Sequence, residues 1–275
     1  LPTALESHAR LDFEPASWRV VHDGTDAKTT EIVDEYFDSS QIVDVPSGLG
    51  FGAKVAAAIS QAPPADWYWL LHDDVILEPG SLSGLLNEAT SDEKLGAVGP
   101  KVREWPSLRR LLEVGLTITG TGHRELGLEP GEPDAGQHDR PKDVLAVGTA
   151  GMLVRATAWH EVGGFDPNLP LFGDDIDFGW RLNKAGWDVR TAPDSIVFHA
   201  EASRGLRRNR RGGVRPRVGE RRSAGLYTLL VNESPARLPL VWLRLFFGCW
   251  IRAFGFVVAK DFKAFRRELA AMLTV

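Results

Sequence analysis

The chain has 275 residues, of which 43% are hydrophobic and 25% charged, as in an ordinary water-soluble folded protein. This length allows one large α/β domain with an appendage and supplies ample material for a core. Cys249 is the single cysteine, which excludes an internal disulfide and a thiolate metal cluster and fits a reducing compartment.

The net charge of −5 is distributed unevenly along the chain. Residues 204–222 contain nine arginines and one glutamate, a local charge of +8, so the remainder carries −13. A basic segment of this kind is suited to phosphates or to anionic lipid. We expect this segment to bind an anionic membrane surface and not to bind nucleic acid.

The first 200 residues alternate between strand and helix patterns. In chain order, strands are expected at 18–21, 41–45, 67–71, 97–98 and 195–198, and helices at 1–10, 26–37, 51–61, 81–89 and 174–184. This alternation predicts an α/β fold with a mainly parallel, doubly wound sheet and right-handed crossovers. No strand precedes the first helix, which we interpret as a missing leading strand. Residues 120–143 predict a long surface loop, interpreted as a lid.

Residues 238–259 form the most hydrophobic segment, long enough to cross a bilayer but interrupted by Arg244 and Arg252. On a helix these arginines share one polar stripe with Arg237, within about 80°. Two interpretations stay open: a helix lying in a membrane interface, and a helix packed on its own domain with arginines reaching solvent. We therefore expect one domain at 1–203, followed at 204–275 by a basic linker and amphipathic helices.

A first polar cluster, His72, Asp73 and Asp74, directly follows the apolar strand at 67–71. In open α/β sheets ligands bind at the carboxyl ends of strands. Carboxylates placed there are poorly solvated and repel each other, so they usually hold a cation. The alternative is a solvated turn with an aspartate helix cap.

A second acidic cluster opens the helix expected at 174–184. The helix dipole favours negative charge in this first turn, so capping is one explanation. Capping needs one carboxylate, and here Asp174, Asp175 and Asp177 are present. Adjacent Asp174 and Asp175 resist joint ionisation, which raises one proton affinity and suits a general base. Asp177 is expected to pair with Arg181 one turn later.

Three further features bear on binding. His199 follows the strand at 195–198; such a histidine is often structural, but an imidazole with a carboxylate also suits Mn²⁺, and less well Mg²⁺. Asp23 and Gly24 end the first strand and either contact a nucleoside or form a turn. Residues 48–52 lack dinucleotide-binding spacing, and no Walker-type phosphate loop is present.

In this order, the segments resemble inverting, family-2 glycosyltransferases of the GT-A fold. The matching pieces are V-V-H-D-G-T-D at 20–26, G-L-G-F-G-A-K at 48–54, W-L-L-H-D-D-V at 69–75, the run at 147–166, F-G-D-D-I-D-F-G-W-R at 172–181 and F-H at 198–199. The resemblance covers about residues 1–205. It is strongest to bacterial rhamnosyl- and galactofuranosyl-transferases that build cell-envelope glycans.

The resemblance implies a nucleotide-sugar donor and a Mn²⁺ or Mg²⁺ cofactor. It implies Asp175, paired with Asp174, as the catalytic base, and Asp74 with His199 as metal ligands. His72 and His22 stand where the family usually has aspartates, which leaves the roles of these positions open. The implied donor-binding residues are Asp23, Gly24, Lys54, Asp73 and Gly151, and further candidates are His72, Trp180 and Arg181.

We therefore predict a metal-dependent, inverting glycosyltransferase acting on an envelope glycan or lipid-linked acceptor at the cytoplasmic face of the membrane. One alternative is a nucleotidyltransferase that makes a nucleotide sugar, although the basic Gly-rich loop that it would normally need after its first strand is not visible. Another is a non-catalytic, membrane-attached glycan-binding domain, which His72 and His22 motivate.

Overall fold

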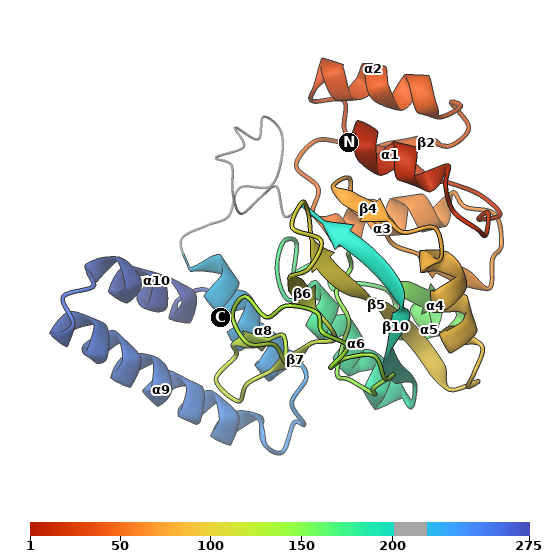
Figure 1. Cartoon of the computed structure of the whole chain (residues 1–275). Helices are drawn as coiled ribbons and strands as arrows, with labels where there is room; N and C mark the ends of the chain where they lie inside the picture. The colour runs from red at the N-terminus through yellow and green to blue at the C-terminus, as the bar shows by residue number, and fades with distance from the viewer. Residues whose placement is uncertain (201–218) are drawn as a thin grey trace.

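The computed structural model describes residues 1–200 and 219–275 (Figure 1). The strands are β1 Val20–His22, β2 Ile42–Asp44, β3 Trp67–Trp69, β4 Val75–Leu77, β5 Leu95–Glu104, β6 Leu111–Glu113, β7 Thr117–Ile118, β8 Arg124–Glu125, β9 Leu153–Arg155 and β10 Asp188–His199. The helices are α1 Pro2–His8, α2 Ala27–Tyr36, α3 Phe51–Ser60, α4 Ser81–Ala89, α5 Ala156–Val162, α6 Asp174–Ala185, α8 Glu220–Val231, α9 Leu238–Val258 and α10 Phe262–Met272.

The central sheet is mixed, so the prediction of a mainly parallel sheet is wrong. Its strand order is β3-β9-β5-β10-β4, with β6 also pairing with β5. Among the described strands of this sheet, β5 and β10 pair in parallel and the other neighbours pair antiparallel. Parallel neighbours need a crossover of about a dozen residues or more. Between β5 and its antiparallel neighbour β9, the chain forms loops and the short strands β6, β7 and β8 instead of a crossover helix.

Helices cover both faces of the central sheet, as the doubly wound pattern predicts. Ala97 of β5 packs into a cluster with Trp159 of α5 and Phe178 of α6. Its neighbour Val98 packs on the opposite face with Leu85 of α4. Successive side chains of a strand point to opposite faces, so one buried strand serves both halves of the core. Strands β1 and β2 form a separate two-stranded parallel sheet.

The loop expected at 120–143 contains β8 and is tied to β5 by ion pairs. Lys101, which is 2% exposed, lies 3.2 Å from an Asp134 oxygen and also pairs with Asp139. Arg103 Nε donates to Asp134 over 2.9 Å. Strand β5 is longer than predicted and runs through Pro100. On the side of β9 its pairing ends at Val98, so the missing N–H of the proline interrupts no ladder there.

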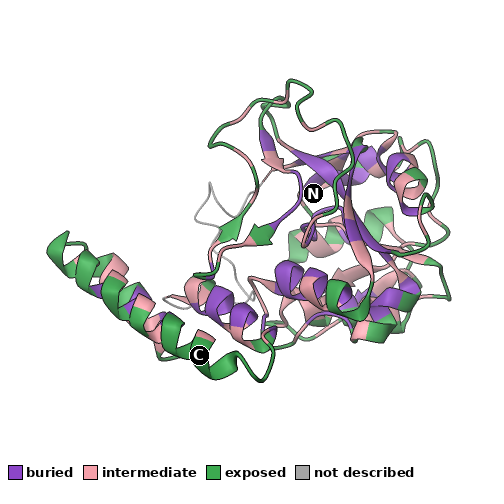
Figure 2. Ribbon diagram, turned by 90° about the horizontal axis from the view of Figure 1, so that it is seen from below, coloured by how far each residue is buried: buried purple, intermediate pink, exposed green. Residues whose placement is uncertain are grey.

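Hydrogen bonds to Asn232, at the end of α8, join the C-terminal helices to α6. Asn232 Nδ2 donates to Asp177 Oδ1 over 2.7 Å, and Lys184 Nζ donates to the Asn232 carbonyl over 3.0 Å. Helices α9 and α10 extend away from the sheet, and α9 carries a largely exposed outer surface (Figures 1 and 2). The boundary expected at 203/204 and most of the basic segment lie outside the described residues.

Candidate functional site

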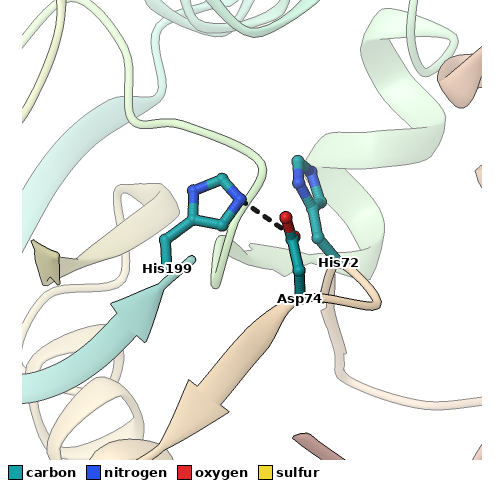
Figure 3. Close-up of side chains that lie close together, drawn as sticks. All are labelled: His72, Asp74 and His199. Carbon is teal, nitrogen blue, oxygen red and sulfur yellow. Dashed lines mark hydrogen bonds and ion pairs between the residues drawn. The ribbon is translucent and has the colours of Figure 1, made fainter. Parts of the chain in front are cut away.

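Pairing between β4 and β10 places an imidazole beside a carboxylate. In this antiparallel pair His199 is the register partner of Val75, the residue after Asp74. The Ala200 amide donates to the Asp74 carbonyl over 3.1 Å, which continues the pairing beyond the strands. His199 Nε2 consequently lies 3.0 Å from Asp74 Oδ1 (Figure 3). Two residues that are 125 positions apart thus form one cluster.

His72 completes a group that could hold a metal ion. Its ring centroid lies 5.4 Å from that of His199, and one potential ligand atom from each of His72, Asp74 and His199 lies within 4.8 Å of the others. Burial, and then the charge of His199, lower the pKa of His72 to about 4, so the ring is neutral near pH 7. Neutral imidazole is the form that binds metals. Two imidazoles and one carboxylate fit Mn²⁺ better than the oxygen-preferring Mg²⁺, and also fit Zn²⁺.

The loop that contains Gly148 and Thr149 connects this cluster to a second group of charges. His72 Nε2 and Thr149 Oγ1 are 2.9 Å apart. The adjacent Gly148 amide donates to Glu113 Oε1. A Cβ at Gly148 would lie 2.5 Å from the Glu113 carboxylate oxygens, so a larger residue there would displace the Glu113 side chain. Glu113 Oε2 in turn accepts from Arg124 Nη2 over 2.8 Å.

Arg124 also reaches the acidic start of α6. Its Nη1 donates to Asp175 Oδ2 over 2.6 Å, and Asp175 Oδ1 accepts from the Ile176 amide over 2.8 Å. Burial and the charge of Asp175 raise the pKa of Asp174 to about 7. This agrees with the expected mutual repulsion of the two adjacent acids. An unbroken series of contacts therefore leads from His72 to Asp175.

The end of β1 and the first turn of α3 border the same region. Lys54 Nζ lies 2.8 Å from Asp23 Oδ2, and Thr25 Oγ1 donates to Asp23 Oδ1 over 2.7 Å. Burial raises the pKa of Asp23, but hydrogen bonds from Lys54 and Thr25 outweigh it, so on balance this pKa is lowered. The Phe51 ring packs 4.9 Å from the His72 ring. The first turn of α3 thus carries a ring that packs on His72 and an ammonium group that pairs with Asp23.

Comparison with known proteins identifies the family. The model of the family described as "Glycosyltransferase like family 2" matches residues 2–212. The chain belongs to this glycosyltransferase family. The enzyme is 29% identical over 216 residues to the N-acetylglucosaminyl-diphospho-decaprenol L-rhamnosyltransferase of Mycobacterium tuberculosis, covering 68% of this chain and 67% of the relative. It is 30% identical over 151 residues to the O-antigen biosynthesis protein RfbC of Myxococcus xanthus, covering 54% of this chain and 12% of that relative.

Solved structures similar to this glycosyltransferase confirm its GT-A fold. The mannosyltransferase PcManGT from Pyrobaculum calidifontis, in complex with GDP-Man and Mn²⁺, has a TM-score of 0.53 at 15% identity and covers 98% of this chain and 81% of its own. The S. aureus enzyme TarS has a TM-score of 0.55 at 13% identity and covers 89% of this chain and 40% of its own. The chain spans 41% of the length of GalNAc-T7, crystallised with UDP, GalNAc and Mn²⁺ (TM-score 0.53, 13% identity, 76% of this chain).

The structure of this glycosyltransferase brings some of the other expected site residues to the cluster and leaves two away from it. Asp73 lies in the turn beside Asp74, and Gly24 follows Asp23 with φ 64°. The Gly151 amide donates to the Leu70 carbonyl over 2.9 Å, which joins the loop at 148–151 to the segment after β3.

Trp180 and Arg181 face away from this cluster. Trp180 packs against an apolar group formed by residues of α8, α9 and α10, which includes Leu226 and Leu245. Arg181 forms an ion pair with Asp177 over 2.8 Å, as expected for residues one helical turn apart, and donates to the Val162 carbonyl over 2.7 Å. Both side chains have structural contacts.

Sequence reasoning missed Glu113 and Arg124. Both lie where the chain has only short strands, β6 and β8, and neither belongs to a recognisable motif. The one available signal was indirect. Two adjacent buried acids at a helix start need a cation nearby, and an arginine is the residue best suited to bridge carboxylates.

Proposed function

We propose that the chain transfers a sugar from a nucleotide-diphosphate donor to a hydroxyl group of an envelope glycan or lipid-linked acceptor, with inversion at the anomeric carbon. The contact series from His72 through Glu113 and Arg124 to Asp175 carries this proposal, because it joins a metal-type cluster to a buried acid pair. The relative from M. tuberculosis, named for a decaprenol-linked acceptor, supports the acceptor class.

Asp74 and His199, with His72 beside them, would hold Mn²⁺ or Mg²⁺. The bound ion would supply Lewis-acid stabilisation of the negative charge that develops on the leaving nucleoside diphosphate. Asp23, Gly24 and Lys54 are proposed to contact the nucleotide, and Asp73 and Gly151 the rest of the donor. The pairing of Lys54 with Asp23 supports this role, because it orients an ammonium group in the helical turn whose Phe51 ring packs on His72.

Asp175 is the proposed base. Its carboxylate takes the proton of the acceptor hydroxyl, whose oxygen attacks the anomeric carbon on the face opposite the diphosphate. The new carbon–oxygen bond forms as the bond to the diphosphate oxygen breaks, and this single displacement inverts the configuration. General-base action contributes about 10²–10⁴-fold, with positioning of the two substrates supplying further acceleration.

The decisive test combines donor, metal and base in one assay. The protein is incubated with UDP-, GDP- and dTDP-linked sugars and a synthetic N-acetylglucosaminyl-diphospho-lipid, with Mn²⁺, Mg²⁺, Zn²⁺ or EDTA. We expect metal-dependent release of a nucleoside diphosphate and a product whose anomeric configuration, measured by NMR, is inverted. Asp175→Asn should lower turnover by about 10²–10⁴-fold while calorimetry shows nearly unchanged donor binding.

Asp188→Asn is the control, because this partly exposed aspartate lies at the opposite end of β10 from His199. Its donor binding and turnover should be nearly unchanged. Retained turnover in Asp175→Asn rejects the base. Release of pyrophosphate from a sugar phosphate and a nucleoside triphosphate would instead favour a nucleotidyltransferase. Absence of any nucleotide-sugar binding with Mn²⁺ would favour a glycan-binding domain.

We further propose that α9 lies in the interface of an anionic membrane, at its cytoplasmic face. Among the described residues, α9 is one helix whose length and composition would allow it to cross a membrane. Arg244 and Arg252 contact the protein, through the Gly120 carbonyl over 2.7 Å and Glu268 over 3.5 Å, respectively. The outer face is left apolar and is 59–73% exposed at Leu240, Phe247, Ile251, Phe254 and Val258.

Co-sedimentation with vesicles that contain anionic lipid tests this surface. Phe247→Ser combined with Ile251→Ser should strongly reduce binding, because about 1.5–3 kcal/mol of burial is lost for each side chain that inserts. Tyr36→Ser is the control, because Tyr36 is an exposed aromatic residue on α2, far from α9 in the sequence. Equal sedimentation of all three proteins would reject the apolar face of α9 as the membrane contact.

A further inference from the structure

The β7–β8 hairpin lies between the candidate catalytic base and the C-terminal helices. Its strands pair Thr117 with Glu125 and Ile118 with Arg124. Ile118 packs against two apolar clusters, one containing Ile176 of α6 and the other Leu226 of α8. In Figure 1 the hairpin is seen next to α8, at the side from which α9 and α10 project. One short hairpin therefore touches both parts of the molecule.

The tip of the hairpin is fastened to α8 and α9. Arg222 of α8 donates to the Thr121 carbonyl, and Arg244 Nη2 of α9 donates to the Gly120 carbonyl over 2.7 Å. The backbones of the hairpin and α8 also touch: a Cβ built at Gly225 would lie 1.9 Å from the Gly122 carbonyl oxygen. Hydrogen bonds from charged donors to backbone carbonyls are stronger than neutral ones, so these two bonds hold the hairpin tip against α8 and α9.

The other end of the hairpin fixes the base. Arg124 spans Asp175 and Glu113 with two different nitrogens, over 2.6 and 2.8 Å. Its side chain is 43% exposed, whereas that of Asp175 is 5% exposed. The planar guanidinium holds both carboxylates in fixed orientations, and the Ile176 amide fixes the second Asp175 oxygen. Asp174, the adjacent acid, has no such bridge from Arg124 among the described residues.

We propose that Arg124 is a positioning residue that selects and orients Asp175 as the base, and that Arg222 and Arg244 hold it in place through the hairpin. The seating of α8 and α9 thereby controls sugar transfer. This inference rests on the proposed function of Asp175. A displaced α9 withdraws the Arg244 contact, the hairpin moves, and Asp175 loses its orienting partner. A base misplaced by about 1 Å can cost about 100-fold in rate.

Steady-state kinetics of the full chain test the positioning role, with the nucleotide sugar and acceptor that the wild type uses. Arg124→Gln should lower kcat by about 100-fold with the donor KM within about twofold, and Arg124→Lys should recover part of the loss because the charge remains. Unchanged kcat in Arg124→Gln overturns the role. So does equal loss in both variants with a lowered melting temperature, which indicates a merely structural contact. An inactive wild type would instead refute the proposed function.

A double-mutant cycle tests the link to the helices. Arg244→Ala should lower kcat by about tenfold, and combining it with Arg124→Gln should add nothing further, since both changes break the same link. Arg237→Ala is the matched control, because this exposed arginine lies at the start of the same helix. Multiplicative losses in the double variant overturn the link. Hydrogen exchange provides a second measurement: the amides of residues 117–125 should exchange faster in Arg244→Ala than in Arg237→Ala, and equal rates would also refute it.

Discussion

Replacing Asp174 by asparagine should stabilise the fold, by an amount that grows with pH. The Asp174 side chain is buried, and folding raises its pKa from 3.8 to about 7, through burial and the charge of Asp175. A carboxyl whose pKa is raised by folding loses stability as the pH rises from its unfolded to its folded pKa. At about 1.4 kcal/mol per pKa unit, ionisation costs about 4 kcal/mol at pH 8 and about 2 kcal/mol at pH 5.

Asparagine keeps the shape of the side chain and removes the charge, so the advantage of Asp174→Asn over the wild type should follow this pH dependence. Urea unfolding at pH 5 and pH 8, followed by circular dichroism, measures the two free energies of unfolding. Asp175→Asn is the matched control, and it should lower the free energy of unfolding instead of raising it. It leaves Arg124 short of one carboxylate and should cost about 1 kcal/mol. The reasoning fails if Asp174→Asn is no more stable than the wild type at pH 8, or if its advantage is the same at both pH values.

Three other outcomes follow from the contacts. Asp134→Ala leaves the buried Lys101 with Asp139, which is 63% exposed, as its remaining ion-pair partner among the described residues. This substitution should lower the free energy of unfolding by about 3 kcal/mol and the melting temperature by roughly 6–12 °C. A shift below about 2 °C would contradict the burial argument. Asn232→Ala removes the bond to buried Asp177 and should lower the free energy of unfolding in urea by about 1–3 kcal/mol, so an unchanged value would count against the bond. His199→Ala should abolish Mn²⁺-dependent donor binding in calorimetry, whereas His160→Ala should not; equal affinities would remove His199 from the metal site.

The sequence predicts the helices better than the sheet, for a physical reason. Helices such as α4, predicted at 81–89 and found at Ser81–Ala89, follow from a local repeat of apolar residues. Strand direction depends on which distant segments meet, and three-residue strands such as β4 and β9 carry no local mark of it. The alternation of elements therefore predicted helices on both faces correctly and the mainly parallel pairing wrongly.

Some residues of the candidate site were likewise predictable from the sequence, and others were not. Asp74 and His199 are recognisable because each belongs to a polar segment that follows an apolar run in the sequence, and the structure brings them together. Arg124 and Glu113 are placed by tertiary contacts of segments that have little periodicity, so no local pattern marks them. Arg181 was a candidate site residue through its place in a motif, but its side chain binds Asp177, the pair that helical spacing predicted.

The pairing of His199 with Val75 has a consequence for how this activity could be lost. Side chains alternate between the two faces of a strand, so a slip of one residue would turn the imidazole to the opposite face. The register of β10 against β5 is already irregular between Ala192 and Ile196, just before this point. Deleting one residue there would disconnect the imidazole from its carboxylate with both still present, so an inactive descendant could retain every recognisable motif.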